Sequence, residues 1–395
     1  MKREWLFDEE HEMFRESTRR WVATEVAPFA DEWEEKVAPF ADEWEEKGEF
    51  PIDLYRKAGE LGFFAGALPE EYGGVGGDFR YHVVFSEELA LSRSYGVSAG
   101  LGLHGFIALP PLANFGTDEL KERYLAPGIR GEIVGALGVT EPDAGSDVGG
   151  LRTKAVRDGD HFVINGAKTF ITNGVRADFH IVACKTDPDK GHRGISQIIV
   201  DKGTPGFTVS RKLDKLGWRA SDTAELSFED VRVPVGNLLG RENNGFYQIM
   251  HGFQAERLGM AVGSVAAAQH CFDITLKYAK ERRIFGKPMG NFQINRHKFA
   301  DMLTWIEAAR RLCYHTIHLY VNGMECAKEI AMCKVFACEK AVEIADMCIQ
   351  LHGGYGYMME YEVQRIWRDQ RIQPIGGGTS EVQKEIIGKL LGLGD

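Results

Sequence analysis

His180-Ile181-Val182-Ala183, Gln197-Ile198-Ile199-Val200 and Ala224-Glu225-Leu226-Ser227-Phe228 decide the fold of this chain of 395 residues. Short runs of β-branched and aromatic residues, separated by Gly, Asp, Asn and Pro, predict strands. Two further runs of this kind are Phe162-Val163-Ile164 and Phe207-Thr208-Val209. No helix-length pattern alternates with them. The sequence therefore predicts a compact antiparallel β domain over residues 135–240, and not a parallel α/β sheet.

Helical periodicity flanks this β region on both sides. Before it, we predict helices over Glu9–Val26 and Pro51–Leu61 and the start of another at Ser86. The Gly-rich stretch 73–77 between them predicts a loop. After Gly245 the helical pattern continues to Gly388, with breaks at 286–290 and 353–356. We therefore expect an α+β protein in the order α, β, α, with domains at 1–134, 135–240 and 241–395.

An exact tandem repeat interrupts the first helical part. The eleven residues VAPFADEWEEK occur at 26–36 and again at 37–47. Two copies are too few for a solenoid. Pro39 argues against a single unbroken helix, because it lacks an N–H and clashes one turn back. We expect a kinked helix or a loop here, and assign no function to the repeat.

Charge and composition exclude several classes of protein. Lys and Arg number 47 and Asp and Glu 58, so the net charge of −11 argues against a nucleic-acid surface. We find no apolar run of the roughly 20 residues that a membrane span needs. The N-terminus also lacks the apolar core of a signal peptide. The seven cysteines form no CxxC pair, which favours buried free thiols and no metal site. We expect a cytoplasmic protein, or one of the mitochondrial matrix whose leader has been removed.

Two polar stretches border the β region. Val139-Thr140-Glu141-Pro142-Asp143-Ala144-Gly145-Ser146-Asp147 could present N–H groups and hydroxyls to a polar ligand, although a surface turn explains it equally well. Lys168-Thr169-Phe170-Ile171-Thr172-Asn173-Gly174 combines an aromatic side chain with directed polar groups, which suits a flat heterocycle. Packing of Phe170 in the core is the alternative.

Three further stretches lie at predicted helix ends. Arg282-Arg283-Ile284-Phe285-Gly286-Lys287, followed by Gln293, places cations at a helix C-terminus, where they are common without any ligand. Gln350-Leu351-His352-Gly353-Gly354-Tyr355-Gly356 ends another helix in a glycine turn. Gly376-Gly377-Gly378-Thr379-Ser380-Glu381 opens the last helix, with Thr379 or Ser380 as its N-cap.

One carboxylate, Glu256, lies in the apolar helical stretch Phe253-Gln254-Ala255-Glu256-Arg257-Leu258. By itself it is most simply explained as a surface ion pair with Arg257. A carboxylate retained for proton transfer is the functional alternative. The sequence holds no Walker loop, HExxH, GxSxG or strand-bounded GxGxxG motif.

Taken in order, these stretches resemble the acyl-CoA dehydrogenase family over nearly the whole chain. The resemblance rests on Thr140…Asp147, Lys168…Asn173, Gly217…Pro234, Arg282…Gln293, Gln350…Gly356 and Gly378…Glu381. It implies an N-terminal helical domain, a middle antiparallel β-barrel-like domain and a C-terminal four-helix bundle. It also implies bound FAD and a homotetramer in which a neighbouring subunit holds the adenine end.

The resemblance also carries site residues onto this sequence. It implies FAD contacts from Leu137, Val139, Thr140, Gly145, Ser146, Phe170, Ile171, Thr172, Arg282, Phe285, Gln293, Gln350, Gly353, Gly354, Thr379 and Glu381. Substrate contacts are implied for Ser146, Phe253, Arg257 and Gly378.

The chain departs from the commoner family pattern at the catalytic base. Short- and medium-chain members carry a Glu directly before the Gly-Thr of the last motif, where this chain has Gly377. Long-chain and isovaleryl members carry it in a helical Glu-Arg-Leu, which here is Glu256-Arg257-Leu258. The resemblance therefore implies that Glu256 is the base and that the Gly377 N–H stabilises the thioester oxygen.

The implied reaction is the dehydrogenation of an acyl-CoA thioester to the trans-2-enoyl-CoA. Glu256 removes the α-proton while FAD N5 accepts the β-hydride, in fatty-acid or branched-chain catabolism. An electron-transferring flavoprotein is the implied electron acceptor. The alternatives are a flavin oxidase or monooxygenase on the same scaffold, and a non-catalytic protein that binds FAD or acyl-CoA.

Overall fold

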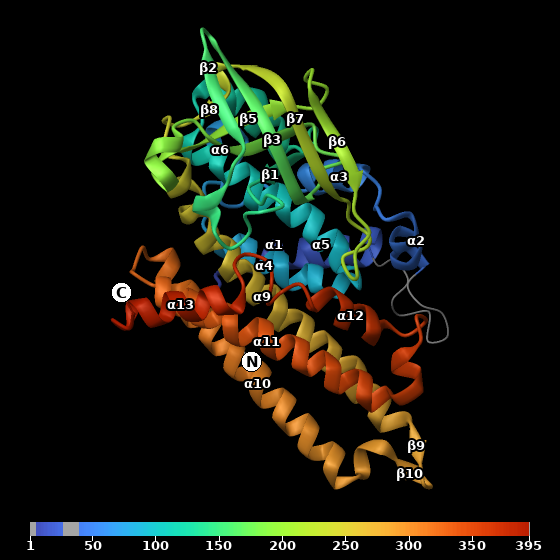
Figure 1. Cartoon of the computed structure of the whole chain (residues 1–395). Helices are drawn as coiled ribbons and strands as arrows, with labels where there is room; N and C mark the ends of the chain where they lie inside the picture. The colour runs from blue at the N-terminus through green and yellow to red at the C-terminus, as the bar shows by residue number, and fades with distance from the viewer. Residues whose placement is uncertain (1–4, 27–38, 395) are drawn as a thin grey trace.

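The computed structural model describes residues 5–26 and 39–394 (Figure 1). The first copy of the repeat, apart from Val26, and the first two residues of the second copy lie outside the described residues. The expected order of a helical part, a β part and a second helical part is confirmed. In Figure 1 the sheet lies at one end, the long C-terminal helices lie at the other, and the N-terminal helices lie between them.

The N-terminal part consists of short helices around an aromatic core that includes Trp21, Phe63 and Phe85. The longest predicted helix is present as α1 with its continuation η1. The helix expected from Ser86 begins six residues earlier, at Arg80, because its first turn also packs inward. The helices here are α1 Glu9–Trp21, η1 Val22–Val26, α2 Pro39–Lys47, α3 Asp53–Glu60, η2 Glu70–Tyr72, α4 Arg80–Leu89, η3 Ala90–Ser92, α5 Tyr95–Gly102, η4 Leu103–Ala108, α6 Leu109–Phe115, α7 Asp118–Leu120, η5 Lys121–Leu125 and α8 Ala126–Ile129.

The second copy of the repeat forms α2, which begins at Pro39 as the missing N–H of proline allows. Its acidic face contacts α12, Glu362–Gln370. Glu45 accepts a hydrogen bond of 2.9 Å from Arg368, and Asp42 pairs with the buried Arg365. These ion pairs tie the N-terminal part to the C-terminal part.

The middle part is one eight-stranded sheet in the order β6-β7-β3-β2-β4-β5-β8, with β1 beside β4. The predicted runs are all strands. The expectation of purely antiparallel pairing is wrong at two places, because β1 and β2 both pair with β4 in parallel. The strands are β1 Gly135–Gly138, β2 Lys154–Asp158, β3 His161–Thr172, β4 Phe179–Lys185, β5 Ile195–Asp201, β6 Phe207–Lys212, β7 Thr223–Pro234 and β8 Leu238–Leu239, with the 3-10 turns η6 Val148–Gly150, η7 Pro188–Gly194 and η8 Val235–Asn237.

The C-terminal part is a bundle of long helices. The breaks expected near 286–290 and 353–356 are present as a small hairpin and a 3-10 turn. The elements are α9 Gly245–Glu281, β9 Arg283–Ile284, β10 Lys287–Pro288, η9 Met289–Asn291, α10 Gln293–Val321, α11 Ala327–His352, η10 Gly353–Tyr357, α12 Glu362–Gln370 and α13 Ser380–Leu390. Helix α9 also contacts α4 and β5, so it joins the bundle to both other parts.

All seven cysteines are free and buried, as expected. One helical run bears on the expectation about membranes. Within the described residues, the helical run Tyr95–Phe115 is long and apolar enough to span a bilayer by length and composition, and half of it is buried. Leu101, Leu109 and Leu112 of this run are fully enclosed in the N-terminal core. The apolar composition of this run is therefore also explained by its packing in the N-terminal core.

Candidate active site

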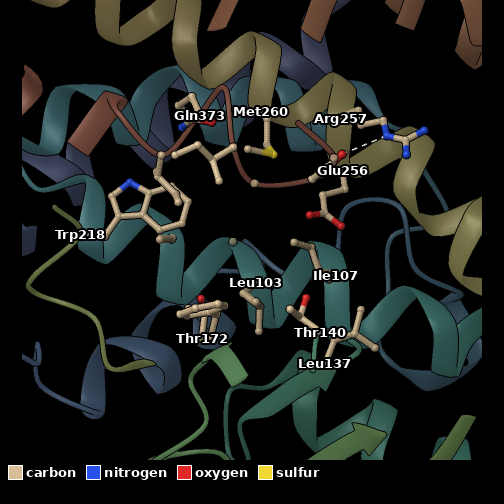
Figure 2. A pocket seen from close by; sticks show the side chains of 18 of the residues that line it. Leu103, Ile107, Leu137, Thr140, Thr172, Trp218, Glu256, Arg257, Met260 and Gln373 are labelled. Carbon is tan, nitrogen blue, oxygen red and sulfur yellow. Dashed lines mark hydrogen bonds between the residues drawn. The ribbon is translucent and has the colours of Figure 1, made fainter. Parts of the chain in front are cut away.

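A cavity of about 1280 Å³ opens where the three parts meet. Its walls come from the sheet, from α4 to η4, from α9 and from residues 371–379 after α12. In Figure 2, Glu256 points from α9 into the space above Leu103, Ile107 and Thr140. The volume exceeds that of a pocket for one drug-sized ligand, which is at most about 1,000 Å³. The cavity can therefore hold a large cofactor together with a substrate chain.

Glu256 is the acidic side chain that α9 contributes to the lining of the cavity. Burial raises its pKa to about 7, while the charges of Arg257 and Lys334 act in the opposite direction. No ion pair of Glu256 is present among residues 5–26 and 39–394, so the surface pairing that the local sequence suggested does not form there. A carboxylate with this pKa can accept a proton at neutral pH.

Arg257 faces away from Glu256 although the two are adjacent. Its Nε donates a hydrogen bond of 3.0 Å to the carbonyl of Gly377 (Figure 2). Its guanidinium also lies 5.5 Å from the centre of the Phe253 ring. Arg257 thus connects α9 to the turn after α12, which has positive φ at Gly377 and Gly378 (63° and 91°). Glycine tolerates this backbone at little cost, and side chains do not.

Gly377 lies so close to α9 that a side chain there would have to displace the side chain of Met260. A β-carbon there would be 2.6 Å from the sulfur of Met260 and 3.5 Å from Oε1 of Glu256. Met260 is one helical turn beyond Glu256, on the same face of α9. The turn therefore brings its backbone, and not a side chain, up to the carboxylate.

The opposite wall belongs to the sheet and the loop after β1. Phe170 has φ of 60° and is 67% exposed, so the core-packing alternative for it is wrong. Beneath it, the buried Nζ of Lys168 donates to the carbonyl of Val139 at 3.0 Å and to Glu141 at 2.8 Å. Glu141 in turn accepts the N–H groups of Arg152 and Thr153. This buried network fixes the loop that begins at Val139.

The chemistry of the lining fits FAD. Three buried polar atoms of lining residues lack a hydrogen-bond partner among the described residues: the Tyr95 hydroxyl, Nε1 of Trp218 and Oε1 of Gln373. Unpaired buried polar atoms are costly and indicate a missing partner. Together with the exposed ring of Phe170 and the hydroxyls of Thr140 and Thr172, they suit a flat heterocycle with polar edges.

The structure divides the sequence-predicted site residues into two groups. The first group lines the cavity: Leu137, Val139, Thr140, Gly145, Ser146, Phe170, Ile171, Thr172, Phe253, Glu256, Arg257, Gly377, Gly378 and Thr379. Thr379 also caps α13, where its hydroxyl accepts the N–H of Val382. Glu381 follows on the first turn of α13, outside the cavity lining.

The second group lies at the far end of the bundle, near β9, β10 and η10 (Figure 1). It comprises Arg282, Phe285, Gln293, Gln350, Gly353 and Gly354. Phe285 is 94% exposed, and Arg282 lies 5.3 Å from the centre of the Tyr355 ring. The chain does not bring this group to its own cavity.

Three residues that bear on the site were not predicted from the sequence. Met260 could have been found, because its spacing of four from Glu256 places both on one face of α9. Lys334 could have been suspected, because it is a lone cation in the apolar helical run Ala331–Cys338. Trp218 has no local signal, since only the packing of its loop brings it to the cavity.

Comparison with known proteins gives a consistent result over the whole chain. Models of the acyl-CoA dehydrogenase N-terminal, middle and C-terminal domains match residues 34–132, 136–231 and 243–392. The chain is 39% identical to the long-chain specific mitochondrial acyl-CoA dehydrogenase of Rattus norvegicus, over 97% of this chain and 87% of that one. It is 41% identical to an acyl-CoA dehydrogenase of Bacillus subtilis, over 97% and 98%.

A solved structure agrees with these sequence matches. The acyl-CoA dehydrogenase of Geobacillus kaustophilus has a TM-score of 0.92 and 42% identity, and the similarity covers 100% of both chains. The order of the three parts along the chain agrees with the order of the three matched domain models. The chain therefore belongs to the acyl-CoA dehydrogenase family of FAD-dependent oxidoreductases.

Proposed function

We propose that this protein converts acyl-CoA thioesters to trans-2-enoyl-CoA, with Glu256 as the base. The observation that carries the proposal is the position of the Glu256 carboxylate, buried in the cavity wall beside the Gly377 backbone. A protein that only binds acyl-CoA or FAD has no need of a buried base with a pKa of about 7.

In this proposal, different residues of the cavity have different roles in the reaction. FAD, when bound against the loop after β1 and the end of β3, supplies the acceptor for the β-hydride. Glu256 takes the α-proton on its carboxylate. The N–H of Gly377, which makes no hydrogen bond with another described residue, would donate to the thioester oxygen as negative charge develops there. Arg257 would hold Gly377 in place through the carbonyl of the next peptide unit, which accepts its hydrogen bond.

The shape of the cavity favours a straight acyl chain of medium or greater length. The lining continues along α9 past Glu256 to Met260 and Gly263. A β-carbon on Gly263, or on Gly102 of α5, would meet nothing within 4 Å. Seven residues of helix span roughly 10 Å. Each carbon of an extended chain advances roughly 1.3 Å, so the cavity holds about eight carbons beyond the base.

The group of predicted FAD residues at the far end of the bundle leads us to propose an oligomer. Arg282, Phe285 and Gln293 lie far from their own cavity, and Phe285 is 94% exposed. They would bind the adenine end of FAD in the cavity of a neighbouring copy, in a homotetramer. An electron-transferring flavoprotein would accept the electrons. The free buried thiols suit a reducing compartment, cytoplasmic or in the mitochondrial matrix.

The decisive variant is Glu256→Gln in the FAD-loaded protein. It should keep the flavin absorbance and bind acyl-CoA, but reduce the flavin more than a thousandfold more slowly than the native protein under anaerobic conditions. A small loss of rate would contradict the role of Glu256. Mixing the reduced native protein with air tests the oxidase alternative, because rapid reoxidation would favour it over a dehydrogenase.

A further inference from the structure

The side chain of Lys334 on α11 is a buried cation that the proposed mechanism does not use. It is 0% exposed, and its Nζ donates a hydrogen bond of 2.7 Å to the carbonyl of Gln373. No carboxylate of the described residues lies within ion-pair distance of it. A buried charge without a paired counter-charge is costly and is retained only where it does something for the protein.

The hydrogen bond places Lys334 at the base of the turn that carries Gly377. Gln373 begins this turn, and the Pro374 carbonyl is held by the N–H of Ser380 at 3.0 Å. At the other end, Arg257 holds the Gly377 carbonyl. Two cations, one from α9 and one from α11, therefore fix the two ends of a segment whose middle is glycine and would otherwise be mobile.

The charge of Lys334 also reaches Glu256. It is one of the two cations that oppose the effect of burial on the pKa of Glu256, and the other is Arg257. The groups whose charges act on Lys334 itself are Cys338 of α11, Arg257 and Glu256 of α9, and Glu381 of α13. Burial lowers the pKa of Lys334, and the acidic neighbours raise it.

We infer that Lys334 is a positioning residue for the reaction, which fixes the Gln373–Gly378 turn so that the Gly377 N–H meets the thioester oxygen. The inference rests on the proposed function, since it assigns Lys334 a task in stabilising the same enolate. It predicts that loss of Lys334 weakens enolate stabilisation more than it weakens ligand binding in general.

The test compares two ligands on the FAD-loaded protein. Acetoacetyl-CoA forms an enolate at its acidic α-carbon, and its absorbance reports the bound enolate. The butyl thioether of CoA has a similar length but no carbonyl. Lys334→Met should lower the ratio of enolate affinity to thioether affinity about tenfold, less than the loss of a whole oxyanion donor. The midpoint of the acid limb in the pH profile of flavin reduction by acyl-CoA should shift upward by about one pH unit, as expected when a nearby opposite charge is removed.

Ile344→Ala is the matched control, because Ile344 is also buried on α11 and does not line the cavity. It should lower the melting temperature and leave the affinity ratio and the acid limb unchanged. Lys334→Gln, which keeps a polar head in the site, serves if the Met variant does not fold. If a Lys334 variant leaves the affinity ratio and the acid limb unchanged, as Ile344→Ala should, the inference about Lys334 is wrong. The proposed function is not affected by that result. Failure of the native protein to bind the enolate would instead overturn the proposed function.

Discussion

The carboxylate oxygen Oε1 of Glu256 lies 3.5 Å from the point where a side chain on Gly377 would begin. The two residues are far apart in the sequence, one on α9 and one in the turn after α12. Their convergence gives a physical reason why the proposed base could be carried at either position. A carboxylate from either segment reaches the same part of the cavity.

Moving the base tests this convergence directly. Glu256→Ala should lose nearly all flavin reduction by acyl-CoA, and the double variant Glu256→Ala, Gly377→Glu should recover a measurable part of it. Recovery should be incomplete, because a side chain at 377 must displace the Met260 sulfur and must adopt a positive φ. Gly376→Glu in the Glu256→Ala background is the control and should recover nothing. Equal recovery by both glutamates would argue against a specific position for the base.

Gly377 itself should not tolerate a methyl group. Gly377→Ala places a β-carbon 2.6 Å from the Met260 sulfur and forces a side chain into a left-handed backbone. The backbone alone costs about 1–2 kcal/mol. We expect a lower melting temperature and slower flavin reduction. Adding Met260→Ala should restore the part due to the steric clash, and no restoration would mean that the backbone alone is responsible.

The rate of flavin reduction should depend on pH near neutrality. Glu256 accepts a proton only when ionised, and its pKa is about 7 before ligand enters. The rate should therefore rise as pH increases through about 7 and level off above it. Stopped-flow reduction of the FAD-loaded protein over pH 5.5 to 9 measures this. A rate that is flat below pH 7 would be incompatible with this base.

The raised pKa of Glu256 also predicts how the stability of the protein depends on pH. Burial raises the pKa of Glu256 from 4.5 to about 7, so the folded protein binds its proton more tightly than the unfolded chain does. Stability contributed by this group is present below pH 4.5 and is lost as pH rises through about 7. Glu256→Gln should thus raise the melting temperature of the FAD-free protein at pH 8 and change it little at pH 4.5.

Filling the end of the cavity should change which acyl chains react. Gly263→Leu should lower kcat/KM for decanoyl-CoA about tenfold or more and leave butyryl-CoA nearly unchanged, because only the longer chain reaches that turn of α9. Gly252→Leu is the control, since Gly252 is on the same helix with open space around it but outside the cavity lining. Equal losses for both substrates would show that the tail does not lie along α9.

Much of the fold and of the site could be predicted, since the strands near Ile181 and Ile198 and the turn at Gly377 have strong local patterns. The parallel pairing of β1 with β4 could not be predicted, because it depends on where the short N-terminal helices place Gly135. Trp218 was missed for a similar reason. Its place at the cavity is set by contacts with α12, where the backbone N–H of Trp218 donates a hydrogen bond of 2.6 Å to the Asp369 carboxylate.

The role of Glu256 could be inferred only by resemblance, because its burial is a property of the assembled domains. Locally it is a helix carboxylate beside an arginine. Arg257 turns away to Gly377 only because the turn after α12 packs there. The environment that changes its pKa is therefore contributed by segments more than 70 residues away in sequence, as the Lys334 contribution illustrates.

The close approach of Met260 to Gly377 also constrains the order in which such a protein can change over evolutionary time. A lineage that shifted its base from α9 to the turn would meet a barrier if the glycine mutated first, because the sulfur already occupies the space. Replacement of Met260 by a smaller residue would have to come earlier, when it brings no catalytic advantage. The proposed base on α9 would thus be kept in place by this packing as well as by its chemistry, since a base on the turn requires a change at Met260 as well.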